Sequence, residues 1–201
     1  MRATISGVYA VYAGPLRDEP IAIELHNTVY AVGGTVVDGL TDSASVEAWL
    51  EGLAGRLPDA GERSKPWPTA QELVELRDAV RVALRAVVAA AAQDAAALEV
   101  INRASARAPR SPIAAWRPDA DPVAATDYHG ASRADVVIAA LASDAIELLT
   151  GPRRGELRAC GAPGCVLMFL KDHPRREWCS NTYGNRARQA RHYQRARRRI
   201  T

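Results

Sequence analysis

Residues 158–199 read RACGAPGCVLMFLKDHPRREWCSNTYGNRARQARHYQRARRR and hold the densest chemistry of the chain. All three cysteines lie here: Cys160, Cys165 and Cys179. From residue 158 to the end, ten arginines and one lysine stand against two acidic residues, a net charge of +9. The whole chain carries only +3, so residues 1–157 sum to −6. A mildly acidic body with a strongly basic end indicates a polyanionic partner.

The cysteine spacing is typical of one half of a zinc knuckle. Cys160 and Cys165 are separated by four residues that include two glycines and a proline, and a tight turn of this kind brings two thiolates close enough to share an ion. Cys179 follows after thirteen further residues. These three thiols are the predicted zinc ligands. The alternative is three reduced cysteines without a metal.

The fourth zinc ligand is open at this point. The position expected for it holds Tyr183, and a phenol binds zinc poorly at neutral pH because it must first lose its proton. His173, His192 or water could complete the site. Neighbouring arginines lower the pKa of a thiol, so a redox response of these cysteines is a variant of the same hypothesis.

This stretch resembles the CGNR zinc-finger family. The resemblance rests on the Cys-x4-Cys pair, the apolar run 166–170, a basic turn at 175–176, Trp-Cys-Ser at 178–180 and Gly-Asn-Arg at 184–186. The family motif Cys-Gly-Asn-Arg reads Tyr183-Gly184-Asn185-Arg186 here, so this chain lacks the motif cysteine. The resemblance implies a bacterial protein whose finger binds zinc.

In that family the finger follows an ABATE domain, a domain named as a stress-induced transcription regulator, and the front of this chain is similar to it. Leu25-His26-Asn27-Thr28 matches the apolar-Asn-Thr segment of such proteins, and residues 46–50, 73–88 and 138–149 fit their helices. The resemblance therefore predicts an ABATE-like domain over residues 1–150, a hinge over 151–157 and the finger with its basic helix over 158–201.

Local patterns predict the elements of the body. Residues 5–13 and 21–32 are rich in β-branched and aromatic residues and predict extended segments. Helices are predicted after Asp42 or Ser43, after the Thr69/Glu72 capping box, after Asp94 and after Ser132. Residues 109–130 fit a hairpin or an ordered loop. The predicted class is α+β: a helix-rich domain with a small sheet, then a treble-cysteine zinc finger and a basic helix.

A basic helix is predicted over residues 185–200, where nothing breaks a helical pattern. Its stripe of small residues is too narrow to bury much apolar area. The helix therefore needs packing against the finger or a partner to be stable. Arginine forks match phosphate oxygens, and several along one helix can follow a DNA backbone. The predicted DNA contacts are Arg186, Arg188, Arg191, Arg195, Arg198 and Arg199. A solvated tail is the alternative, and Arg186 could instead brace the finger.

Other classes of function are disfavoured by the sequence. The four histidines, His26, His129, His173 and His192, show no metal-ligand spacing, and no phosphate loop or nucleophile elbow is present. We therefore expect no enzyme activity. The longest apolar run, 86–92, is too short to span a membrane, and reduced cysteines fit the cytoplasm. Few aromatic residues accompany the arginines, which disfavours RNA binding.

The sequence thus predicts a bacterial transcription regulator whose finger and basic helix bind DNA. The body would sense a small-molecule effector or form a homodimer. The competing hypothesis is a protein- or small-molecule-binding module in which the finger is only structural. The two hypotheses differ in whether the chain binds DNA in a salt-dependent way.

Overall fold

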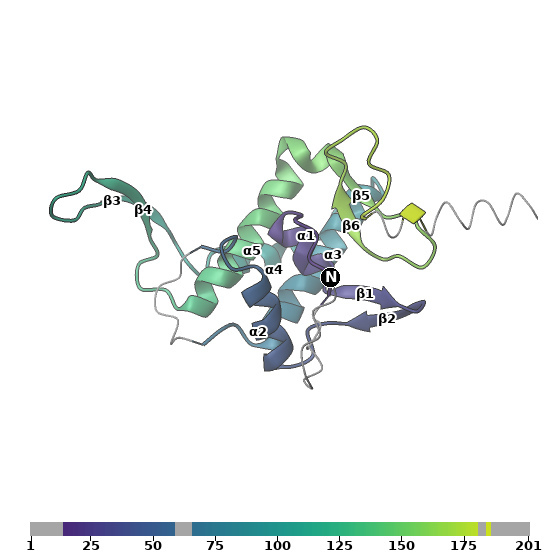
Figure 1. The fold of residues 1–201 in the computed structure, drawn as a ribbon, viewed down its shortest axis with the longest axis horizontal. Helices are drawn as coiled ribbons and strands as arrows, with labels where there is room; N and C mark the ends of the chain where they lie inside the picture. The colour runs from purple at the N-terminus through teal and green to yellow at the C-terminus, as the bar shows by residue number, and fades with distance from the viewer. Residues whose placement is uncertain (1–13, 59–65, 181–183, 186–201) are drawn as a thin grey trace, which may run out of the picture.

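A computed structural model describes residues 14–58, 66–180 and 184–185 (Figure 1). The described chain contains helices α1 (Ile21–His26), α2 (Ser43–Gly52), α3 (Ala70–Val88), α4 (Ala95–Ser105) and α5 (Arg133–Thr150), and the 3-10 helix η1 (Pro152–Glu156). None of the described helices combines the length and apolar character needed to cross a bilayer.

The strands of the described residues form three separate antiparallel ribbons. β1 (Val29–Val32) pairs with β2 (Thr35–Asp38), β3 (Ser111–Ala115) with β4 (Val123–Asp127), and β5 (Leu157–Ala159) with β6 (Met168–Leu170). The helix-rich α+β class with a cysteine finger is confirmed. All but the first residue of the predicted basic helix (185–200) lies outside the described residues, and so does the predicted extended segment over residues 5–13.

The predicted helix starts are confirmed, because each rests on a local cap. The side chain of Asp42 accepts a hydrogen bond from the Ser45 backbone N–H at the start of α2, and Asp94 caps α4 in the same way. Thr69 and Glu72 form the predicted capping box of α3, and Ser132 caps α5. Such caps pair backbone N–H groups that the first helical turn leaves without a partner.

One predicted element is wrong. Residues 21–32 were expected to be extended, but residues 21–26 form α1 and only Val29–Val32 is a strand. Five of the six α1 residues are buried, so the segment must pair its own backbone groups, and helical hydrogen bonds do this within six residues. Packing against α3 and α5 overrides the strand preference of its β-branched residues.

The main core includes both the helices and the finger. Leu25, Trp49 and Leu141 are buried in it, as are Leu157 of β5 and Leu170 of β6. The finger ribbon therefore packs directly on the helical body (Figure 1). Most of residues 151–157, predicted as a hinge, is the helix η1. The predicted division of the chain at these residues stays a prediction.

Candidate metal centre

A tight turn after β5 brings the first two cysteines together. Cys160 follows the strand directly, and its backbone N–H donates to the carbonyl of Leu167 at 2.9 Å. The backbone N–H of Cys165 donates to the carbonyl of Ala162 at 3.0 Å, which closes the turn. Gly164 has φ of 71°, a conformation that glycine adopts without strain. The glycines noted in the sequence thus shape the predicted knuckle.

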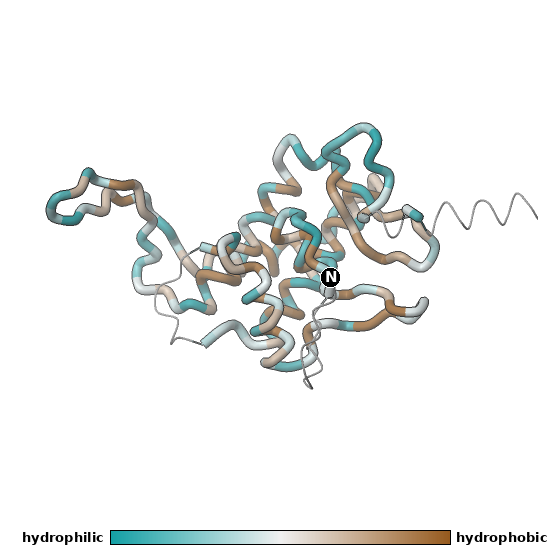
Figure 2. The backbone as a smooth tube through the Cα atoms, in the orientation of Figure 1, coloured by the Kyte–Doolittle hydropathy of each residue, from teal (hydrophilic) through white to brown (hydrophobic). Residues whose placement is uncertain are grey.

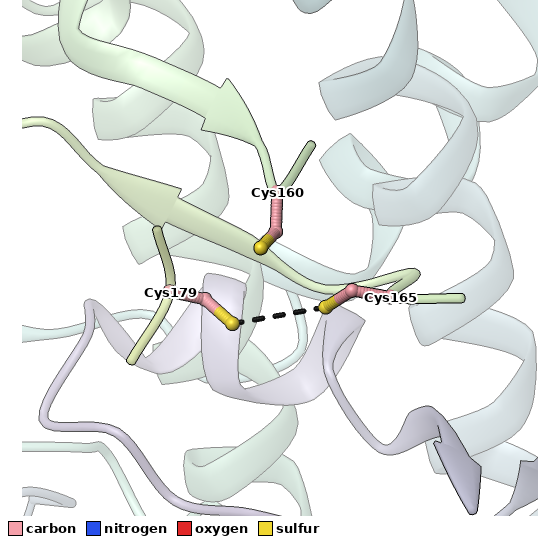
Figure 3. A group of neighbouring side chains, drawn as sticks. All are labelled: Cys160, Cys165 and Cys179. Carbon is pink, nitrogen blue, oxygen red and sulfur yellow. Dashed lines mark hydrogen bonds between the residues drawn. The ribbon is translucent and has the colours of Figure 1, made fainter. Parts of the chain in front are cut away.

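The three thiols meet at one point, although Cys179 comes from a separate loop (Figure 3). Their sulfur atoms all lie within 4.8 Å of one another, and the Sγ atoms of Cys165 and Cys179 are 3.7 Å apart. A tetrahedral zinc ion with Zn–S bonds of about 2.3 Å places its sulfurs roughly 3.8 Å from each other. A disulfide would need about 2.05 Å. The spacing therefore fits a shared zinc ion.

The surroundings of the thiols favour a structural ion over a reactive site. Cys160 and Cys179 are buried and Cys165 is half-buried, within a second apolar cluster that includes Tyr30, Leu167 and Phe169. Hydrogen bonds with the other two thiols lower the pKa of the Cys160 thiol well below its usual value of 9.0, and hydrogen bonds with Cys160 and Cys165 raise the pKa of the Cys179 thiol. When bound, zinc would replace these shared protons and hold the two ends of the finger together.

The structure does not bring the predicted fourth ligand into this group. Among the described His, Asp, Glu and Cys residues, only the three cysteines gather here. The side chain of His173 is exposed, and its Nδ1 accepts a hydrogen bond from the Arg175 N–H at 3.1 Å. Tyr183 and His192 lie outside the described residues, as do the predicted DNA contacts from Arg186 to Arg199.

The finger is tied to the body by a buried asparagine. Asn27 ends α1, and its amide donates to the carbonyl of Met168 at 3.0 Å while its Oδ1 accepts from the Met168 N–H at 2.9 Å. The side chain thus pairs with β6 as a neighbouring strand would. His26 Nδ1 lies 3.2 Å from the same Oδ1, and burial lowers the pKa of this histidine to about 3, so the ring is neutral.

A buried acid makes the second tie. The carboxylate of Glu19 accepts a hydrogen bond from the Leu170 N–H at 3.0 Å and forms an ion pair with Arg176 of the finger. Burial raises the pKa of Glu19, although both partners favour the charged form. Glu24 supports this arrangement, because its Oε1 accepts from the Glu19 N–H at 2.9 Å.

Sequence reasoning identified the three cysteines but missed both acids. Their signal was available: Glu19 and Glu24 flank an apolar segment in which an unpaired charge would be costly. Asn27, part of the segment that is similar to ABATE proteins, satisfies the buried backbone groups of Met168.

The comparisons with known families agree with this architecture. A model of the ABATE family, described as "Putative stress-induced transcription regulator", matches residues 19–152. The chain belongs to this family. A model of the CGNR zinc finger matches residues 156–196, which include all three cysteines. A search of curated proteins found no match.

Proposed function

We propose that this ABATE protein is a DNA-binding transcription regulator. Its zinc-ordered finger would present the basic end of the chain to DNA, while the body senses a small molecule or joins two copies. One observation carries the proposal: residues 158–201 combine a net charge of +9 with the three-cysteine site. They follow a domain whose family is described as a transcription regulator. Neutralising phosphates with arginine supplies most of the affinity in such contacts.

Basic side chains near the finger support the proposal. Arg154 of η1 and Arg175, in the loop before Cys179, are exposed, and neither side chain makes a hydrogen bond or ion pair with another described residue. By contrast, Arg176 is committed to Glu19. Arg154 and Arg175 can therefore contact phosphate without breaking an existing interaction.

A second candidate is favoured by how deeply the finger is packed. Leu157, Met168 and Leu170 belong to the main core, so the finger also serves the body as a structural element. A binding module with a purely structural finger would share this feature. Such a module would not need the free arginines beside the finger, and DNA binding separates the two candidates.

The proposal assigns no catalysis to the chain. One Ser–His–Asp group occurs among the described residues: Ser111 Oγ lies 2.9 Å from His129 Nε2. The distance from His129 Nδ1 to Asp127 Oδ2 is 3.7 Å, too long for the hydrogen bond that orients a catalytic imidazole. All three side chains lie at the base of a surface ribbon, where they fasten the two strands.

Fluorescence anisotropy tests DNA binding. The zinc-loaded protein is titrated onto labelled duplexes of its own promoter and a scrambled sequence at increasing salt. We expect binding that prefers the promoter and weakens steeply with salt. Replacing Arg191 and Arg195 with alanine should weaken binding to every duplex and reduce the salt slope by about 1 for each lost phosphate contact.

Arg110→Ala with Arg117→Ala is the matched control, because it also removes two positive charges, just before and within the β3–β4 ribbon, which lies on the opposite side of the molecule from the β5–β6 ribbon (Figure 1). If the Arg191/Arg195 variant binds DNA as tightly as the wild type, the predicted basic helix is not the contact surface. No binding to either duplex would favour the structural finger.

A further inference from the structure

The β3–β4 ribbon, which we call the arm (residues 111–127), projects away from the helical body (Figure 1). Its strands contact chiefly each other. Its base is fastened: Ser111 Oγ bonds with His129 Nε2 at 2.9 Å, and the His129 N–H donates to Asp127 Oδ1 at 2.8 Å. The arm is thus a defined ribbon with little support from its own chain.

The arm contains apolar residues far from the core (Figure 2), and its large apolar side chains are exposed. Ile113, Trp116 and Val123 are 45%, 66% and 61% exposed. Ile113 and Val123 lie on one face, together with Ala115 and Ala125, because paired residues of a ribbon share a face. A two-stranded ribbon is at best marginally stable in water, whereas three or more strands with an apolar face can be stable. This arm lacks additional strands within its own described chain.

Only one edge of the arm is open to another strand. Pro112 pairs with Thr126 inside the β3–β4 ladder, and a proline within a ladder turns its N side to the outer edge. β3 therefore lacks one of its two outward donors, the one at Pro112. The backbone groups of Thr126, and of Ala124 two residues before it, point outwards from β4, which contains no proline.

The open edge fits a second copy of itself. A two-fold axis at Ala125 sets Ala124 of one chain opposite Thr126 of the other, so both outward pairs form hydrogen bonds at once. Small alanines at the centre allow the strands to approach. Residues 111–127 contain one arginine and three aspartates, so this surface repels nucleic acid and differs from the basic end of the chain.

We propose that the arm joins two copies of this chain into a homodimer, by antiparallel pairing of β4 with β4 across a two-fold axis at Ala125. The pairing makes a four-stranded sheet in which the apolar face of each arm becomes continuous with the other. This inference rests on the proposed function in one respect, because it names the surface that would join two copies, and it does not depend on DNA binding.

Sedimentation velocity of the full chain over a range of micromolar concentrations, without DNA, tests the proposal. Ala124→Pro removes the outward donor of β4 in the way that Pro112 already does on β3. Val123→Asp places a second carboxylate opposite Asp127 of the other copy. We expect the wild type to dimerise and each variant to raise the dimer dissociation constant about tenfold or more. Circular dichroism confirms that each variant is folded.

Ala114→Asp is the matched control, because Ala114 lies on the opposite face of the arm and on the blocked strand. It should leave the dimer intact. A wild type that is monomeric throughout the range would overturn the proposal, and so would a dimer that survives both β4 variants. Equal dissociation by Ala114→Asp would also contradict the assigned edge.

Discussion

The ribbons β5–β6 and β3–β4 both leave a helical body as short antiparallel pairs, yet they are supported in opposite ways. β5–β6 places Leu157 and Leu170 in the main core and receives side chains of Asn27 and Glu19 along β6. β3–β4 leaves Ile113 and Val123 in water. A two-stranded pair needs stabilisation from elsewhere. The main core supplies it for β5–β6, and we propose that a second copy of the chain supplies it for β3–β4.

The β5–β6 ribbon of the finger is therefore packed into the main core and is not attached to the body only through a linker. A finger that hung from a flexible linker would gain its order from zinc alone. Here apolar burial and two buried polar ties act on β6, and a zinc ion at the three cysteines would hold the loops before and after this strand. The metal should therefore affect the helical body as well as the cysteine loops.

Removing a zinc ligand should have the largest effect on the stability of the finger and the body. Cys179→Ser deletes one of three thiolates, so metal content should fall from stoichiometric to near none, since structural zinc contributes on the order of 10 kcal/mol in small fingers. The thermal midpoint of the whole chain should fall with it. Elemental analysis and calorimetry measure both. A chelator added to the wild type should reproduce the result, and retained zinc would refute the site.

Breaking the asparagine tie should have the next largest effect. Asn27→Ala leaves the buried N–H and carbonyl of Met168 without partners and should lower the free energy of unfolding by about 2–4 kcal/mol. Urea unfolding measures this. Asn102→Ala, at an exposed site on α4, should change it by less than about 0.5 kcal/mol. Equal losses in the two variants would mean that Asn27 does not hold β6.

The smallest expected effect concerns the pH dependence of Glu24. Burial raises its pKa above 4.5, so from pH 4.5 up to the raised value the folded state keeps a proton that the unfolded state has lost. The free energy of unfolding should fall as the pH rises through this window. Glu24→Gln removes this contribution while Oε1 can still accept from the backbone. Glu51→Gln is the exposed control.

Urea unfolding at a series of pH values compares these variants. Glu19 and Asp144, whose pKa values burial also raises, should leave part of the slope in place. An unchanged slope in Glu24→Gln would show that this carboxyl group does not titrate differently on folding.

Local signals in the sequence predicted much of this fold. The caps at Asp42, Thr69 and Ser132 act within a few residues. The turn between the first two cysteines is likewise predicted by the glycines and the proline between them. Helix α1 could not be predicted in the same way. A six-residue helix with five buried residues shows no helical stripe, so its β-branched composition suggested a strand.

The ties between body and finger were also beyond sequence reasoning. Asn27 and Met168 are 141 residues apart, and Glu19 and Arg176 are 157 apart. Neither pair belongs to a motif, because each depends on how α1 lies against β6. His173, one of the alternatives for the fourth ligand, is exposed and lies outside the cysteine group.

Hydrogen exchange of the zinc-loaded and chelated protein tests the shared fold most directly. If the finger and the body are one unit, removing zinc will speed amide exchange in β6 and also in α1, whose end holds β6 through Asn27. Faster exchange confined to residues 158–180, with α1 unchanged, would contradict that account and make the finger a separate module.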